Sequence, residues 1–205
     1  MPDVKSQRLE YVQQTKESLL AAAETLFVRE GFRATSIDAV GAAARFTKGA
    51  VYRHFADKEA LFLAVFERVE VDIAQQLAAR AEACAGPTEA ALAALQRFLE
   101  LATETRFRRI VLEEGPVALG WRRWRELDHQ YTALLLERLL GDLADAGKIA
   151  PTSVGMLARL CCALAGEAAF QVAEADDPDR ARADTLATIG AMLGGLAAAD
   201  PGSRG

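Results

Sequence analysis

The stretch Thr35–Leu61, TSIDAVGAAARFTKGAVYRHFADKEAL, decides the fold. Thr35, with Asp38 three residues later, forms a variant of the capping box and predicts the start of a short helix. Thr47 can cap a second short helix, and only a brief break at Arg45 separates the two. Two short helices joined by a tight turn, with a longer first helix to support them, are the plan of a helix-turn-helix unit.

Cap and turn signals divide the rest of the chain into further helices. Gly31 stands where a glycine in the left-handed conformation ends a helix. Gly86-Pro87, Gly115-Pro116 and Asp176–Pro178 are stops, and no run of residues has the pattern of a strand. The expected helices cover about 8–30, 36–44, 48–55, 58–84, 88–105, 107–113, 121–146, 153–175 and 178–199. We therefore expect an all-α protein of about nine helices.

Composition restricts the class of protein. Of 205 residues, 51% are hydrophobic, which is enough for a packed core, and the net charge of −5 argues against a protein that coats nucleic acid non-specifically. Residues 1–60 carry a net charge of +1, so a local basic face remains available. Three cysteines, two of them adjacent, do not suggest a disulfide framework. No signal peptide or membrane-length apolar run is present, and we expect a cytoplasmic protein.

The second short helix carries side chains suited to DNA. In a helix-turn-helix this helix enters the major groove, where base contacts specify the site and phosphate contacts position the protein. Thr47 and Lys48 lie at its leading end, and Gly49 and Ala50 are small enough for a close approach. Tyr52 and His54 can donate hydrogen bonds to phosphates, and so can Lys58 at the start of the next helix.

These residues resemble the TetR family of bacterial repressors. The family pattern ends its recognition helix in Tyr-x-His-Phe followed shortly by Lys, and this chain has Tyr52-Arg53-His54-Phe55 and Lys58. Leu26-Phe27, Gly31-Phe32 and Thr35 also stand at the family's spacing. The resemblance implies DNA contacts from Thr35, Thr47, Lys48, Tyr52, His54 and Lys58. It also implies a DNA-binding domain over residues 1–57 and an effector-binding and dimerisation domain over residues 58–205.

The chain departs from the family pattern at two positions. Arg45 occupies the turn, where the family usually has glycine because a left-handed backbone is convenient there. A residue with a side chain in that conformation costs roughly 1 kcal/mol, although Arg45 can add a phosphate contact. Gly41 stands in the first short helix, where the family often has alanine. Both changes can loosen the DNA-reading unit.

The resemblance also implies an effector pocket among the middle helices of the second domain. One face of the expected helix 121–146 carries Trp121, Trp124, Asp128 and Tyr131 at helical spacing as candidates for its wall, and aromatic or apolar residues before that helix can complete it. Ordinary core packing is the alternative. The candidates are Phe98, Phe107, Ile110, Trp121, Trp124, Asp128, Tyr131 and Glu167. Glu167 stands alone in an apolar run and can either pair with an arginine of a neighbouring helix or hydrogen bond a ligand.

Small and apolar residues in the last two helices suggest a homodimer interface, a four-helix bundle built from two chains. These residues are Leu157, Leu164, Ile189, Gly190, Leu193, Gly194 and Leu196.

The sequence therefore predicts a DNA-binding transcriptional regulator. We expect a repressor that binds a palindromic operator as a homodimer and is released when a small-molecule effector binds. The alternative is an activator, or a protein with the TetR fold and an altered output. We expect no enzyme activity, since no catalytic motif, metal-ligand cluster or cofactor site is recognisable.

Overall fold

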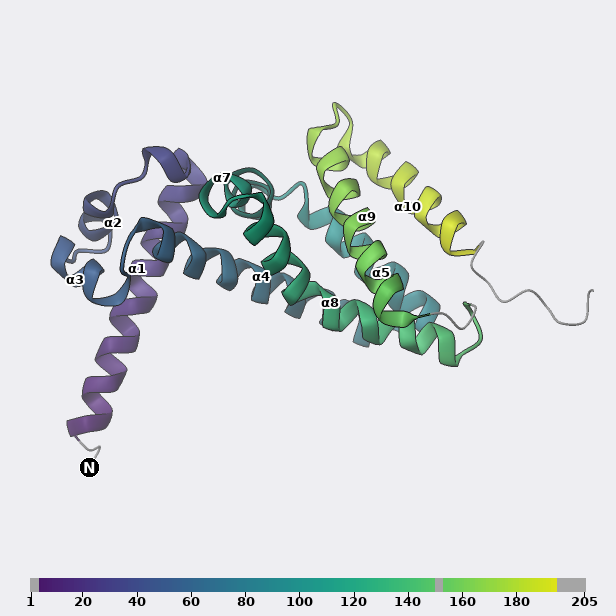
Figure 1. Ribbon diagram of the computed structural model, residues 1–205, viewed down its shortest axis with the longest axis horizontal. Coiled ribbons are helices and arrows are strands. Elements are labelled where there is room, and N and C mark those ends of the chain that lie inside the picture. The colour runs from purple at the N-terminus through teal and green to yellow at the C-terminus, as the bar shows by residue number, and fades with distance from the viewer. Residues whose placement is uncertain (1–3, 150–152, 195–205) are drawn as a thin grey trace, which may run out of the picture. The chain divides into compact units, whose positions relative to one another are not determined.

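The computed structural model describes residues 4–149 and 153–194, and every regular element within those ranges is helical (Figure 1). The elements are α1 (Val4–Ala34), α2 (Ile37–Ala43), α3 (Lys48–His54), α4 (Lys58–Glu82), α5 (Pro87–Leu101), α6 (Thr105–Phe107), the π-helical segment η1 (Arg108–Glu114), α7 (Gly115–Leu119), α8 (Trp121–Asp145), α9 (Val154–Glu174) and α10 (Pro178–Gly194). The prediction of an all-α fold is confirmed.

The chain divides into two compact units, which differ from the predicted domains 1–57 and 58–205. The first unit contains Met1–Val69 and Arg109–Trp124, and the second contains Glu70–Arg108 and Arg125–Gly205. The first part of α4 belongs to the first unit because Phe62 packs edge-on against Phe27 and Phe32, with ring centroids 5.1 and 5.3 Å apart. Such aromatic pairs bury a large apolar surface and so hold this part of α4 to α1.

Caps and a glycine determine where the first three helices begin and end. Figure 1 shows α2 and α3 beside α1 in the first unit. The predicted stop at Gly31 is confirmed, because its φ of 82° breaks the helical backbone. The predicted cap at Thr35 is wrong by one residue: the Ser36 hydroxyl accepts the N–H of Ala39 at 3.1 Å. The predicted cap at Thr47 is confirmed, since its hydroxyl accepts the N–H of Ala50 at 3.3 Å.

The segment between α5 and α8 differs from the prediction. A helix was expected over 107–113 that ended before Gly115-Pro116, whereas helical backbone runs through α6, η1 and α7 as far as Leu119. Proline is accepted in the first turn of a helix, where its missing N–H would have no partner, so Pro116 helps to begin α7. The stop lies instead at Gly120, whose φ is 76°.

The second unit is built from helices that pack along their lengths. α5, α9 and α10 lie side by side (Figure 1) around the buried residues Leu99, Ala168, Val172 and Ile189. α8 joins this group through a second cluster, in which Leu140 and Leu143 meet Ala158 of α9. α9 begins where a helix was expected, and the Ser153 hydroxyl caps it by accepting the N–H of Met156 at 3.4 Å.

Candidate nucleic-acid interface and ligand cavity

α3 has one buried side and one exposed side. Val51 is fully buried, and Phe55 directly after the helix is nearly so. The opposite side presents Lys48, Gly49 and Tyr52 to solvent. His54 is half-buried and Ala50 partly covered. The predicted DNA contacts on α3 are thus accessible, and they share a helix whose other side is fixed in the core.

Gly49 has no packing reason to be glycine. A Cβ atom added there would meet only the Thr47 hydroxyl oxygen, at 3.9 Å, which is an ordinary van der Waals distance. Glycine in a helix costs about 0.5–1 kcal/mol relative to alanine. Gly41 of α2 contrasts with it, because an added Cβ would lie 3.0 Å from the main-chain oxygen of Phe46. Gly41 therefore serves the packing of the helix-turn-helix, while Gly49 leaves free space on the exposed side.

An ion pair connects the two short helices. The Lys48 ammonium donates to the Asp38 carboxylate at 2.9 Å, and both side chains are exposed. The hydrogen bond and the charge of Asp38 raise the pKa of Lys48 above its usual value. The pair directs Lys48 back along α2, and sequence reasoning did not identify Asp38 as its partner.

Arg45 adopts the left-handed conformation expected in the turn, with φ of 62°. Its side chain is exposed. The main chain around it is well bonded, since the N–H of Phe46 donates to the Gly41 carbonyl at 2.8 Å. The turn is therefore formed in spite of the side chain, and the cationic group of Arg45 lies at the surface between α2 and α3.

Two predicted DNA contacts have structural roles. Thr35 is only 1% exposed, and its hydroxyl donates to the Gly31 carbonyl at 2.8 Å, so it stabilises the break after α1. The Lys58 ammonium donates to the Phe32 carbonyl at 2.8 Å and lies 4.4 Å from the centre of the Phe32 ring. Both side chains therefore help to fix the helix-turn-helix to α1, and their predicted contacts with DNA stay predictions.

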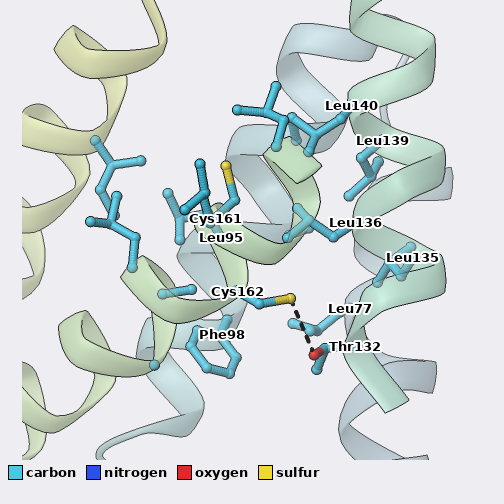
Figure 2. Close-up of a pocket in the computed structure, with 18 of the residues that line it drawn as sticks. Leu77, Leu95, Phe98, Thr132, Leu135, Leu136, Leu139, Leu140, Cys161 and Cys162 are labelled. Atoms are coloured by element: carbon cyan, nitrogen blue, oxygen red, sulfur yellow. Dashed lines mark hydrogen bonds between the residues drawn. The ribbon is translucent and has the colours of Figure 1, made fainter. Parts of the chain in front are cut away.

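A cavity of about 390 Å³ lies within the second unit (Figure 2). α4, α5, α8, α9 and α10 contribute its wall, which consists mainly of leucine, alanine and other apolar side chains. Phe98 and Asp128, both predicted as pocket residues, line it. Thr132 and Cys162 also line it, and their oxygen and sulfur atoms lie 3.7 Å apart (Figure 2). Sequence reasoning missed these two residues, although Thr132 lies one helical turn after Asp128.

Two carboxyl groups influence each other at this cavity. Asp128 lines it, and burial raises the pKa of Asp128 to about 6, although the charge of Arg125 acts in the opposite direction. Glu70 of α4 is 1% exposed, and its Oε1 has no hydrogen-bond partner among the described residues. Burial and then the charge of Asp128 raise the pKa of Glu70 well above its usual value. Burial thus favours the neutral form of Glu70, whereas a pKa of about 6 leaves Asp128 mostly ionised at neutral pH.

The other predicted pocket residues do not line this cavity. Ile110, Trp121 and Trp124 belong to the first unit, where the two indole rings lie 4.8 Å apart. Phe107 is buried, with its ring edge-on to Phe98 at 5.8 Å, and thus supports a lining residue. Of the remaining two candidates, Tyr131 is half-buried and Glu167 is exposed. Glu167 accepts a hydrogen bond from Gln171, on its own helix, at 2.9 Å.

α9 and α10 expose apolar side chains, but these are only in part the predicted interface residues. Ile189 is buried in the core and Leu157 packs beside Ala158, so both act within the chain. Leu164 is exposed, and Met156 and Leu160 continue a stripe at four-residue spacing that sequence reasoning missed. Gly190 is half-buried, with open space beside it. α10 ends at Leu193 and Gly194, where the structure describes the backbone only. Leu196 lies outside the described residues.

Neither a metal centre nor a disulfide is found in the part of the chain that the structure describes. No three His, Cys, Asp or Glu side chains gather there in a way that could hold a metal ion, and Cys84, Cys161 and Cys162 are free thiols. By length and composition alone, α9 could cross a membrane. Because core helices of soluble proteins pass the same test, one such helix is weak evidence for a membrane protein.

Comparisons with known proteins agree with this geometry. A family profile described as bacterial regulatory proteins, tetR family, matches residues 19–65. A profile described as the C-terminal domain of tetracyclin repressor-like proteins matches residues 88–196. A crystal structure of a TetR-family transcriptional regulator from Pectobacterium atrosepticum is 30% identical, with a TM-score of 0.80 over 93% of this chain and 97% of that one.

Two further proteins extend the comparison. The Transposon Tn10 TetC protein from Escherichia coli is 27% identical over 127 residues, or 62% of this chain. That match spans 64% of the length of TetC. RolR, solved in complex with resorcinol, is 20% identical, with a TM-score of 0.70 over 96% of this chain and 97% of that one. At this identity the likeness to RolR concerns the fold alone.

Proposed function

Because the chain belongs to the TetR family of bacterial regulatory proteins, we propose that it represses transcription as a homodimer bound to operator DNA in the cytoplasm. A small molecule in the cavity of the second unit releases it from the operator. The observation that carries the DNA-binding part is Gly49, an exposed helical glycine for which the protein's own packing gives no reason. Close approach of the α3 backbone to the floor of a groove supplies that reason.

The surface around Gly49 supports the same role. Thr47 and Tyr52 present hydroxyl groups, and Lys48 and Arg53 present cations, on the exposed side of α3. Arg53 was not among the predicted contacts. Phosphate contacts from such side chains position a protein on DNA, and they make its affinity fall as salt rises. The Lys48–Asp38 ion pair must open or tilt for Lys48 to reach DNA, so Asp38 reduces the contribution of Lys48 to DNA affinity.

The effector part rests on the cavity. A volume of about 390 Å³ with an apolar wall and few polar groups suits a small organic ligand. RolR, which shares the fold, was solved with resorcinol bound. A ligand that binds more tightly to the conformation unsuited to DNA shifts the population towards that conformation, and linkage requires DNA to weaken ligand binding by the same factor.

The homodimer rests on the stripe Met156, Leu160 and Leu164 on α9. Contiguous exposed apolar side chains on a soluble protein mark an interaction site. A second copy that covers the stripe brings two α3 helices together around a twofold axis. Such a dimer reads two half-sites about 34–36 Å apart, one turn of DNA, or a multiple of that distance, and the operator is correspondingly palindromic.

Selection of sheared genomic DNA by the purified protein tests the proposal. We expect enrichment of a palindromic site, with an affinity that falls steeply between about 50 and about 200 mM salt. The double variant Lys48→Ala, Tyr52→Phe should weaken binding at least about tenfold. Gly49→Leu should abolish specific binding because its side chain holds α3 away from the bases. A reporter gene behind the enriched site then distinguishes repression from activation.

Two controls match these variants. Arg180→Ala removes an exposed cation that pairs with Asp184 on α10, far along the chain from α3, and should leave DNA affinity unchanged. Gly141→Leu places the same side chain at another helical glycine with open space beside it. If Gly49→Leu binds the enriched site as tightly as Gly141→Leu, α3 is not the reading helix and the proposal fails.

A further inference from the structure

The polar groups in the described part of the cavity wall are few, and a single carboxylate is the charged group among them. Among the described residues that line it, Asp128 is the charged one, and Lys, Arg and His are absent from the wall. Thr132, one helical turn further along α8, adds a hydroxyl, which donates to the Asp128 carbonyl at 2.9 Å. The rest of the wall is mainly aliphatic. A ligand therefore meets hydrocarbon on most of its surface and a carboxylate at one place.

A second carboxyl group adds to the acidic character of that place. Glu70 is fully buried in α4, close enough to Asp128 for the two charges to interact, and its Oε1 lacks a hydrogen-bond partner among the described residues. Burying an unpartnered polar atom costs stability, and burying two carboxyl groups together costs more. Such an arrangement is typical of a binding site that a ligand completes.

The protein compensates the Asp128 charge only in part. The titratable or charged groups that act on or beside it are Glu70 from α4, Arg125 from α8 and Cys162 from α9. Arg125 is exposed, and its charge acts to lower the pKa of Asp128. The pKa of Asp128 remains raised to about 6 although Arg125 lowers it. The ionised carboxylate therefore gains from a further cation brought in with the ligand.

On the premise that this cavity is the effector site of the proposed function, we propose that its ligand is a mostly hydrocarbon molecule with one protonated amine, which the Asp128 carboxylate binds. The ammonium donates to the carboxylate, and the hydrocarbon portion packs along the leucine-rich wall. A ligand with an anionic head meets Asp128 as a like charge and no cationic lining residue, so the cavity excludes it.

Three probes of one chain length test the head group. Octylamine, octanol and octanoate share the hydrocarbon and differ in carrying a cation, a neutral hydroxyl and an anion. Calorimetric titration of the full chain, without DNA, should give the tightest binding for octylamine and weaker binding for octanol by at least about tenfold. Octanoate should not bind measurably. Equal affinity for octylamine and octanol, tighter octanoate binding, or no binding of octylamine overturns the proposal.

Two variants locate the charge. Asp128→Asn should weaken octylamine at least about tenfold and leave octanol within about threefold, because it removes the ionic part of the contact alone. Glu70→Gln puts a neutral group of the same shape at a position outside the cavity wall, and octylamine affinity should change less than about threefold. Thermal melts check folding, and Asp128→Asn should be no less stable than wild type since it removes a buried charge. Loss of octylamine binding in Glu70→Gln but not in Asp128→Asn contradicts the assignment.

Acidification gives an independent readout. A pKa of about 6 leaves roughly a tenth of Asp128 ionised near pH 5, so octylamine affinity should fall about tenfold between about pH 7.5 and about pH 5. Asp128→Asn should remove most of this dependence, and an equal fall in the variant contradicts the role of Asp128.

Failure of the ligand proposal can be distinguished from failure of the proposed function, because ligand binding is measured without DNA. If octylamine binds the protein but does not release it from the operator, only the proposed function is contradicted. If another compound releases the protein from the operator and octylamine does not bind, only the proposed ligand class is contradicted.

Discussion

Arg45 keeps a left-handed backbone, with φ of 62°, in the turn on which the DNA-reading unit depends. This conformation costs a residue with a side chain roughly 1–2 kcal/mol, and glycine avoids the cost but has more freedom to lose on folding. We expect Arg45→Gly to raise the free energy of unfolding by about 0.5–1 kcal/mol. In a chain of this size the melting temperature should rise by about 1–4 °C, measured by circular dichroism.

Arg45→Ala is the matched control, because it removes the same charge but keeps the Cβ atom that causes the strain. Its melting temperature should stay near that of wild type. Equal stabilisation in both variants would mean that charge repulsion, not the backbone, disfavours arginine here. Equal weakening of operator binding in both, with a smaller salt dependence, would identify Arg45 as a phosphate contact.

Single residues of the cavity could be predicted from the sequence only in part. Asp128 was found because it recurs at helical spacing with large side chains of the same helix, and Phe98 was found as an aromatic residue that could complete the pocket. Glu70 was missed, although a signal was present: it interrupts the apolar series Phe62, Phe66, Ile73 and Leu77 on α4. A carboxyl group on the buried stripe of an amphipathic helix is costly, and its position there indicates a binding or coupling role.

A cluster of contacts within the first unit joins the end of α1 to the segment η1–α7. The Glu114 carboxylate accepts the N–H of Phe32 at 2.9 Å and lies 3.4 Å from the Arg109 guanidinium. Arg109 in turn donates to the Val28 carbonyl at 3.2 Å. Gly31 makes room for this contact, because a Cβ atom there would lie 2.5 Å from the Glu114 carboxylate. The break after α1 is thus held by a segment about 80 residues further along the chain.

Removal of Glu114 should weaken the first unit. Glu114→Ala leaves the Phe32 N–H without its acceptor, and we expect a loss of about 1–3 kcal/mol in the free energy of unfolding, measured by urea denaturation. Glu113→Ala removes the neighbouring carboxylate, which is more exposed and also pairs with Arg109, and should cost less than about 1 kcal/mol. Equal losses in the two variants would contradict the role given to the Phe32 contact.

Element boundaries were predictable where a cap or stop acts locally and not where the contact is distant. Gly31 and Thr47 signal their helix ends through backbone freedom and a side-chain cap, and the structure agrees at both. Thr35 and Ser36 are both suitable residue types for the cap of α2. Thr35 is buried, and its hydroxyl donates to the Gly31 carbonyl, so Ser36 is the residue that caps the helix. The helical backbone continues through Gly115-Pro116 in a segment that contacts α1, and a local sequence pattern cannot predict such distant contacts.

The oligomer and its ligand belong to the whole molecule and were the least predictable from one chain. Small residues in the last two helices indicated an interface, but packing within the chain already uses Ile189 and Leu157. What remains for a partner is a stripe whose members became recognisable only through their exposure. The same reasoning separates Trp121 and Trp124 from the cavity, because residues spaced along α8 belong to two different compact units.

Disruption of the stripe should produce a monomer that binds its operator poorly. Leu160 is 62% exposed, and Leu160→Glu places a charge at the centre of the proposed interface. We expect a monomeric mass by sedimentation at micromolar concentration and at least about a tenfold loss of operator affinity, because the two α3 helices no longer bind as a linked pair. Met156→Glu, which lies on the stripe but outside the cavity wall, should act in the same direction.

Leu134→Glu provides the control, since Leu134 is 76% exposed on α8 and carries the same substitution off the stripe. It should remain dimeric and bind the operator as wild type does. A dimeric Leu160→Glu, or a monomeric Leu134→Glu, would place the interface elsewhere. A monomeric Leu160→Glu that retains full operator affinity would show that one α3 helix is sufficient for recognition, and the palindromic operator would then lose its physical reason.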